Sequence, residues 1–478
     1  MDRKWRALTI VCVAIFMLLL DITVVNVALP DIQKELKTSF TDLQWVVDAY
    51  ALMLATVMLN AGSLGDWLGR KRVFISGIAL FTIASALCGA ATSPLFLNLA
   101  RGAQGIGGAI MFAVSLAIVA QEFHGRERGT AFGIWGATVG AAVAIGPLIG
   151  GALTTWAGWR WIFFVNLPIG ALCIVFGLRE LHESRDEEHG GFDLPGFATL
   201  TLGLFALVLG LLRGNDWHWS SGRVVGLFAA AAVLLTAFVV VEARQEEPTL
   251  DISLFRTPSF TGAQLVAFVL SSGMFSLFLY LTLYLQNVLH YSPIGAGLRF
   301  LPFSLSSFIV APIAGRLSAR VPIRILFGVG LAAVGVALLW MHGVSPTSHW
   351  TTLLGGFLLG GAGVGLVNAP LAATAVSVVE QRRAGMGAGV NNTFRQVGIA
   401  TGIAALGAIL QSRAGSAVAA SGRGDPAKYV SGLNEILIVG AIVLFVGAVL
   451  GFALVRARDF VTSGPQQPQQ QQPAPGAA

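Results

Sequence analysis

The feature that most constrains this chain is a series of apolar runs, each about as long as a bilayer-spanning helix. Such a helix needs about 20 predominantly apolar residues, and the chain of 478 residues holds about fourteen runs of this kind. The run at 196–212 is the shortest, so the count depends on it. The runs predict an all-α polytopic membrane protein, with spans near 6–29, 43–64, 73–91, 95–119, 129–151, 161–179, 196–212, 222–242, 259–285, 295–315, 322–342, 351–374, 387–411 and 433–455.

The composition agrees with a bilayer as the surrounding solvent. Charged residues make up only 11% of the chain and apolar residues 55%, whereas soluble domains carry roughly 25% charged residues. The cysteines Cys12, Cys88 and Cys173 fall in three different runs, a spacing that predicts neither disulfides nor a metal site. There is no nucleotide-binding loop and no soluble catalytic domain, so we expect neither an enzyme nor a bound cofactor.

The basic residues predict the orientation. Cytoplasmic loops are rich in Lys and Arg, and the basic residues favour one set of loops by roughly two to one. This bias places both termini in the cytoplasm and predicts a multi-pass protein of the inner cell membrane. Arg213 is assigned to an outer loop. The net charge of +6 therefore marks cytoplasmic loops and does not indicate nucleic-acid binding. The first run is too long for the apolar region of a cleaved signal peptide.

An internal repeat predicts two homologous halves. Residues 101–140 resemble residues 357–396 at a constant offset of 256, and Gly62–Lys71 resembles Gly315–Arg324. Chance likeness between glycine-rich helices is the alternative. Parallel halves of this kind hold substrate between them near the bilayer midplane. The predicted divisions are a six-helix half at 1–180, a loop with two extra helices at 181–256, a second six-helix half at 257–458, and a disordered Gln/Pro-rich tail at 459–478.

The loop between the second and third runs reads Gly-Ser-Leu-Gly-Asp-Trp-Leu-Gly-Arg-Lys-Arg and resembles the loop motif of the major facilitator superfamily. Its glycines permit close approach, and its acid can pair with nearby arginines, so the cluster can latch one conformation. An ordinary positively charged cytoplasmic loop is the alternative. The second copy has Ala319 where an acid could have stood, which puts a second latch in doubt. The motif residues are Gly62, Asp66, Gly69, Arg70 and Arg72.

The fifth run is rich in glycines four residues apart, a spacing that lets helices touch backbone to backbone. It resembles the antiporter motif of the same superfamily, which is associated with exporters. With residues 20–30, 159–163 and 284–286, the chain resembles the fourteen-span drug:proton antiporter branch, the QacA/EmrB type. The glycines could instead form an ordinary packing seam. The motif residues are Gly136, Gly140, Gly146, Pro147, Gly150 and Gly151.

Four charged residues, Asp21, Asp48, Arg101 and Arg395, are singled out inside predicted spans, where charge is costly and usually functional. At 1.5 Å per residue, Asp21, Arg101 and Asp48 lie about 12, 10 and 8 Å inside the outer boundary. They are predicted to form a cluster. Burial favours the protonated form of an acid, whereas a neighbouring arginine favours the ionised form. We therefore expect Asp21 or Asp48 to carry the coupling proton and Arg101 to tune it. A static ion pair that fixes helix packing is the alternative.

A further polar group is predicted to contact substrate or to act in gating: Asn26, Asn392, Arg395 and Gln396. A packing role for Arg395, satisfied by backbone carbonyls, is the alternative. Together these features predict a proton-coupled antiporter that exports small amphipathic or cationic molecules by alternating access. The proton gradient would be its energy source, and it would work as a monomer. The alternatives are an exporter of one metabolite, antibiotic, amino acid or lipid on the same fold, or a membrane sensor that has lost transport.

Overall fold

The computed structural model describes residues 2–37, 40–123, 125–185, 193–245, 250–380, 383–415 and 425–459. Its regular secondary structure is helical throughout this part of the chain. Thirteen helical segments of the described residues are long and apolar enough to cross a membrane. The 33-residue helix α5 (Gly125–Ala157) is the remaining long helix. The predicted all-α polytopic fold is confirmed.

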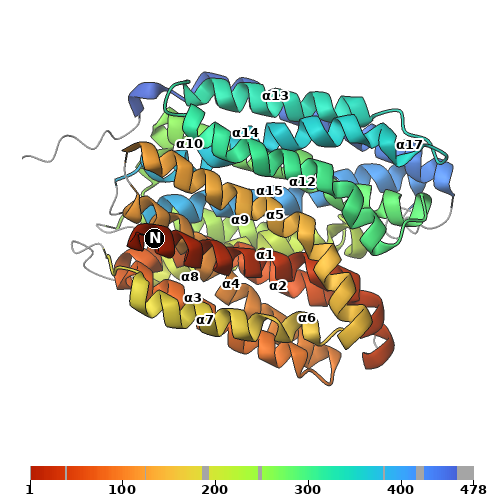
Figure 1. Ribbon diagram of the computed structural model, residues 1–478, viewed down its shortest axis with the longest axis horizontal. Helices are drawn as coiled ribbons and strands as arrows, with labels where there is room; N and C mark the ends of the chain where they lie inside the picture. The colour runs from red at the N-terminus through yellow and green to blue at the C-terminus, as the bar shows by residue number, and fades with distance from the viewer. Residues whose placement is uncertain are drawn as a thin grey trace, which may run out of the picture.

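The long helices form two bundles that lie side by side (Figure 1). The first contains α1 (Arg3–Leu36), α2 (Phe40–Leu68), α3 (Arg70–Gly89), α4 (Pro94–Glu122), α5, α6 (Trp161–Phe164) and α7 (Asn166–Glu180). The second contains α10 (Pro258–Leu270), α11 (Leu277–Leu283), α12 (Pro293–Leu317), α13 (Ile323–Met341), α14 (Leu354–Ser377), α15 (Ala384–Ala414) and α17 (Pro426–Leu454). The second bundle also contains two π-helical turns, η2 (Ser271–Phe275) and η3 (Tyr284–Val288).

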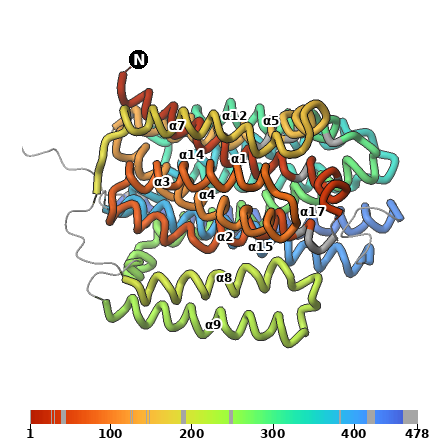
Figure 2. Tube along the Cα trace, turned by 90° about the horizontal axis from the view of Figure 1, so that it is seen from below, coloured from red at the N-terminus to blue at the C-terminus, as the bar shows by residue number. Residues whose placement is uncertain are grey.

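Two further helices, α8 (Leu194–Trp217) and α9 (Gly222–Glu242), form a hairpin outside the two bundles (Figure 2). The shortest predicted run therefore belongs to a full-length helix of 24 residues. α8 continues beyond residue 212 as far as Trp217. Arg213 lies within the helix and is buried, with only 1% of its surface exposed. The assignment of Arg213 to an outer loop was wrong. α8 packs on α2 of the first bundle and on α15 of the second.

The two bundles meet along two helix pairs, α5 with α12 and α2 with α15. At one end, Gly62 lies against Gly385 and Gly129 lies against Gly315, each so closely that a Cβ would collide with the partner's backbone. Gly129 corresponds to Gly385 in the internal repeat, and Gly62 corresponds to Gly315. The two contacts are therefore the same contact made twice, with the roles of the repeats exchanged. This reciprocity supports the homology of the two copies.

Each bundle contains most of its own hydrophobic core. One core gathers residues of α10–α15 and α17. The other gathers residues of α1–α5 and α7, and it extends across the interface to Ala372 and Val376 of α14 and to Ala384 and Ala388 of α15. The N-terminal residues and the end of the described chain lie at the same end of the bundles (Figure 1). Because most of each core lies within one bundle, a tilt of the bundles against each other would disturb only the part of the packing that crosses the interface.

Candidate functional site

The most deeply buried charges of the first bundle form an ion pair between α1 and α4. Arg101 Nη1 donates to Asp21 Oδ2 at 2.5 Å, and the two side chains are 1% and 0% exposed. The sequence predicted this pairing from the similar depth of the two residues. A buried pair is costly to assemble and much more costly to break by removing one partner. Loss of the charge on Asp21 would therefore leave Arg101 as an unpaired buried cation.

Neutral polar side chains complete the surroundings of this pair. Asp21 Oδ1 accepts hydrogen bonds from Gln104 Nε2 at 2.9 Å and from Asn166 Nδ2 at 3.0 Å. Gln104 Oε1 in turn accepts from Arg101 Nη1 at 2.7 Å. Asn166 also donates to Ser85 Oγ, which donates to the carbonyl of Phe163. One carboxylate thus connects side chains of α1, α3, α4 and α7. A change in its charge would alter the hydrogen bonds that link these four helices.

The guanidinium of Arg101 is also held by α2. Its Nε donates to the carbonyl of Val46 at 3.0 Å, and its Cζ lies 4.2 Å from the ring centroid of Tyr50. Such a cation–π contact is strongest when the cation is desolvated, as it is here. The buried hydroxyl of Tyr50 has no hydrogen-bond partner among the described residues. Arg101 is therefore enclosed by α1, α2 and α4.

The sequence had predicted that Asp48 would join this cluster, but in the structure it lies elsewhere. Its Oδ2 lies 2.9 Å from Arg213 Nη2 of α8. The physical reason is helical periodicity, because Val46 and Tyr50 are four residues apart and share the face of α2 that meets Arg101. Asp48 lies on another face, as does Trp45, whose ring centroid is 4.4 Å from the guanidinium of Arg213. Asp48 and Arg213 therefore attach the extra hairpin to α2.

The loop motif contains a second buried carboxylate, and this one joins the two bundles. Asp66 Oδ1 accepts from Arg70 Nη2 at 2.8 Å within its own bundle. Across the interface, Asp66 Oδ1 accepts from the backbone N–H of Gly385 at 3.1 Å, and Oδ2 accepts from that of Met386 at 2.9 Å. These amides are the unpaired donors at the start of α15, where the helix dipole favours negative charge. Asp66 thus caps a helix of the opposite bundle.

The rest of the motif shapes the loop that carries Asp66. Gly69 has φ of 109°, a value that side-chain-bearing residues rarely adopt, and it directly precedes α3. Arg72 is exposed and lies 3.5 Å from Glu183 of the same bundle. The backbone N–H of Arg70 donates to the carbonyl of Ser184 at 2.9 Å. These contacts keep the loop folded but do not cross between the bundles.

The glycines predicted as an antiporter motif give α5 close contacts on two sides. Gly146 and Gly150 face Thr23 and Val24 of α1, and Gly136, Gly140 and Gly151 face α12 and α14. A Cβ at Gly150 would lie 3.0 Å from Cα of Val24. The motif thus places α5 against both bundles at once. The side chain of Pro147 lies outside the part of the chain that the structure describes.

The polar group predicted on α15 is buried near the interface between the bundles. Arg395 is 8% exposed, and its Nη2 donates to Asn368 Oδ1 of α14 at 2.7 Å. The carboxamide of Asn392 is buried, and neither of its polar atoms has a partner among the described residues. Gln396 is half-buried on the same helix. The side chain of Asn26, the fourth predicted residue, is not among those described.

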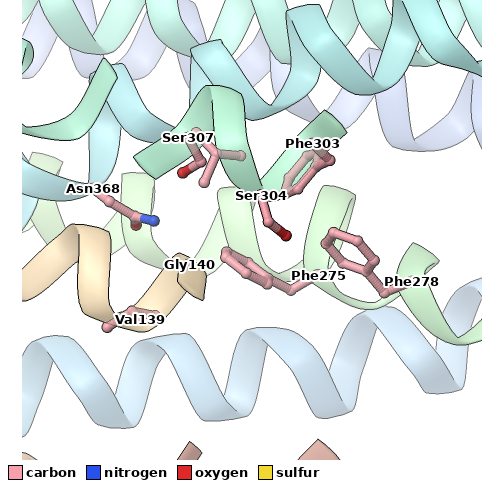
Figure 3. Close-up of a pocket in the computed structure, with 9 residues that line it drawn as sticks. Val139, Gly140, Phe275, Phe278, Phe303, Ser304, Ser307 and Asn368 are labelled. Carbon is pink, nitrogen blue, oxygen red and sulfur yellow. The ribbon is translucent and has the colours of Figure 1, made fainter. Parts of the chain in front are cut away.

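A small pocket lies next to this polar group. Figure 3 shows Asn368, Ser304 and Ser307 on one part of its wall and the rings of Phe275, Phe278 and Phe303 on another. Val139 and Gly140 bring α5 of the first bundle to the same space, and Val364 of α14 completes the lining. The cavity therefore lies between the two bundles, where the repeat had predicted a substrate site.

Several residues of these sites were not predicted from the sequence. Gln104 lies three residues after Arg101, so its place on the same helix face could have been read from the spacing. Asn166, Asn368 and Arg213 are single polar residues in or beside apolar runs, and only the packing of distant helices reveals their partners. Phe275 closes the π-helical turn η2. Such turns are frequent at functional sites, but the sequence gives no signal for one here.

Comparison with known proteins places these features in a family. The model described as "Major Facilitator Superfamily" matches residues 11–403. The multidrug resistance protein Stp of Mycobacterium tuberculosis (strain CDC 1551 / Oshkosh) is 37% identical over 411 residues, which cover 85% of this chain and 76% of Stp. The puromycin resistance protein pur8 of Streptomyces alboniger is 37% identical over 468 residues, which cover 95% of this chain and 92% of pur8.

Two further similarities extend the comparison. The tetracenomycin C resistance and export protein of Streptomyces glaucescens is 34% identical over 421 residues, covering 86% of this chain and 77% of that protein. Among solved structures, the human organic anion transporter MFSD10 (TETRAN) aligns with a TM-score of 0.67 over 94% of this chain and 100% of that chain. At 15% identity this second similarity shows a shared fold and nothing more about function.

Proposed function

The chain belongs to the major facilitator superfamily, and we propose that it is a proton-coupled antiporter that exports small amphipathic molecules from the cell. The observation that carries this proposal is the buried network around Asp21 and Arg101. It supplies an acid that can gain and lose a proton and a fixed cation that responds to the change. Both sit in the interior of a helix bundle, where intramembrane charges usually mark ion or substrate pathways.

The proposed coupling follows from the geometry of the network. A proton on Asp21 would remove the counter-ion of Arg101 and leave a buried cation unpaired, which is strongly unfavourable. The network would then have to rearrange, because a neutral carboxyl accepts more weakly from Gln104 and Asn166 than a carboxylate does and its own O–H needs an acceptor. Because these side chains belong to different helices, the rearrangement would change the packing of the whole first bundle. Proton binding and release would thus bias the bundle between two arrangements.

The contact between the bundles provides the second part of the proposal. The cytoplasmic ends, as oriented by the basic residues, are held by Asp66 at the start of α15 and by the two glycine contacts. Substrate would enter the cavity from the cytoplasm while this end is open and leave after it closes. The fourteen-span branch, the inner membrane location and action as a monomer are parts of the same proposal.

The relatives bear on the direction of transport and on the breadth of cargo. Proteins named for multidrug resistance, puromycin resistance and tetracenomycin C export resemble this chain over most of their length. Export is therefore the proposed direction. A second candidate, the export of one specific metabolite or antibiotic, is favoured by the relatives that are named for a single compound.

The proposal is tested by transport in proteoliposomes with an imposed pH gradient. The purified protein should concentrate a fluorescent aromatic dye against its gradient when protons can flow in the opposite direction. An ionophore that collapses the proton gradient should stop this movement. Concentrative transport that continues at the same rate after collapse would defeat proton antiport. Asp31→Asn, at an exposed position near the other end of α1 from Arg3, serves as a control for substitutions at Asp21.

A further inference from the structure

We propose that the cavity between the bundles selects flat aromatic molecules that carry a negative charge, with Arg395 as the residue that sets this preference. The inference rests on the proposed export function and assigns the charge of its cargo. No carboxylate is among the residues that line the cavity. The nine lining residues are three phenylalanines, two serines, two valines, one glycine and one asparagine, none of which carries a charge.

The three acids of α1 and α2 that the ion pairs and the loop motif involve do not supply a carboxylate for a bound cation. Asp21 accepts hydrogen bonds through both oxygens from Arg101, Gln104 and Asn166. Asp48 is paired with Arg213, and Asp66 is held by Arg70 and by the start of α15. Each of these carboxylates already has its cation or its helix dipole. A cationic substrate would therefore meet no counter-ion among them.

Arg395 is in the opposite situation, because its charge is buried without an acid. Within the described part of the chain, no carboxylate lies within 4.0 Å of its guanidinium, and its Nε has no hydrogen-bond partner. A guanidinium does not lose its proton in a protein, so the positive charge remains. A desolvated cation without a partner is unfavourable. An anion in the neighbouring cavity would supply the missing charge.

Asn368 connects this charge to the cavity. A guanidinium can only donate hydrogen bonds, so the amide oxygen of Asn368 faces Arg395, in agreement with the 2.7 Å contact. The NH₂ group is then directed away from the guanidinium. It donates to no described residue, and Figure 3 shows the Asn368 side chain at the cavity wall. A ligand oxygen there would accept from an amide that is itself polarised by the cation behind it.

The remaining wall favours aromatic cargo with oxygen substituents. The rings of Phe278 and Phe303 meet edge to face with centroids 4.8 Å apart, and Phe300 lies 5.2 Å from Phe278. Such a cluster can stack or edge-pack against a planar ligand. The hydroxyls of Ser304 and Ser307 have no partners among the described residues and can bind phenolic or carbonyl oxygens. Ring faces also attract cations, so the aromatic wall alone would accept either charge. The positive charge of Arg395 favours the anionic ligand over the cationic one.

The preference can be measured with two dyes that share a xanthene ring system, anionic fluorescein and cationic rhodamine 123. Binding to the purified protein is followed by fluorescence anisotropy, which is independent of any proton gradient. We expect fluorescein to bind at least about tenfold more tightly, as one nearby charge in a low-dielectric site would produce. Arg395→Gln should remove this difference, and Arg395→Lys should keep most of it. The matched control is Arg413→Gln, on the same helix but exposed and paired with Glu435 outside the cavity.

A second variant covers the case in which Arg395→Gln does not fold. Asn368→Asp keeps the size of the side chain and places an acid against Arg395, so it should weaken fluorescein binding and strengthen rhodamine 123 binding. Equal affinities, tighter binding of rhodamine 123, or no measurable binding of either dye to the wild-type protein would overturn the inference. These outcomes leave proton-driven export untouched, because that is decided by transport under a pH gradient. Binding with the expected charge preference but without proton-driven transport would instead defeat the proposed function.

Discussion

Removal of the Asp66 carboxylate should open the end of the interface between the bundles at which Asp66 meets α15. In Asp66→Ala the backbone amides of Gly385 and Met386 lose their acceptor at the start of α15. Loss of a helix cap costs about 0.5–2 kcal/mol, and a favourable charge at a partly buried helix end contributes up to about 2 kcal/mol. These hydrogen bonds exist only when the bundles touch. The variant should therefore lose about 1–3 kcal/mol of the free energy that stabilises the closed state relative to the open state. The ratio of closed to open molecules should therefore fall about 5- to 150-fold.

Spin labels at residues 127 and 320 would measure this shift. Both positions are exposed, one at the start of α5 and the other just beyond α12, on opposite bundles. The native cysteines Cys12, Cys88 and Cys173 are buried, so labelling should favour the introduced ones. Pulsed electron–electron resonance should show a longer distance gaining population in Asp66→Ala. Asp66→Asn should give a smaller shift, since one amide oxygen can still accept.

Arg72→Gln provides the control for this experiment. It removes an ion pair from the same loop, but that pair joins Arg72 to Glu183 within one bundle. The distance distribution of this variant should therefore match that of the wild-type protein. If Asp66→Ala also left the distribution unchanged, the cap on α15 would not contribute to closure and the reasoning would fail.

Three further predictions concern other contacts. Gly129→Ala should weaken closure at the same end of the interface, because a Cβ there collides with the backbone of Gly315. Gly226→Ala, in open space on α9, should be neutral or slightly stabilising. The same spin-label pair reports the first effect, and thermal unfolding reports the second. Asp48→Asn should lower the free energy of unfolding by about 1–3 kcal/mol, because it removes an acid that is paired with the buried Arg213, and a shift in the thermal midpoint measures this. Gln104→Leu should slow proton-driven transport more than dye binding, since it removes two hydrogen bonds from the Asp21 network but none from the cavity; equal losses in both would argue for a general folding defect.

The sequence predicted the helices well because the bilayer imposes a simple requirement on length and polarity. The pairing of Asp21 with Arg101 was predictable for a related reason. Both are charged residues in apolar runs at one depth, and opposite charges in the membrane interior usually pair. The contact of Gly62 with Gly385 illustrates how a repeat identifies equivalent positions without showing which of them touch. The role of Asp66 as a cap on α15 needed the arrangement of the two bundles.

The misplacement of Asp48 and Arg213 shows where prediction from sequence fails. Depth along a helix can be read from residue counts, but the face on which a side chain lies relative to its neighbours depends on helix packing. Arg213 was assigned to a loop because its charge ends the apolar run, yet it is buried against Trp45 and Asp48. The cavity was equally beyond the sequence, because its wall combines residues from α5, α11, α12, α14 and η2.

The central claim is that a proton on Asp21 is exchanged for substrate. The most direct test is to measure proton release when substrate is added to the purified protein in weakly buffered detergent solution, with a pH-sensitive dye as reporter. The wild-type protein and Asp31→Asn should release protons in proportion to the substrate bound. Asp21→Asn should still bind substrate but release none. Undiminished proton release from Asp21→Asn, or substrate binding to the wild-type protein without any proton release, would contradict the claim.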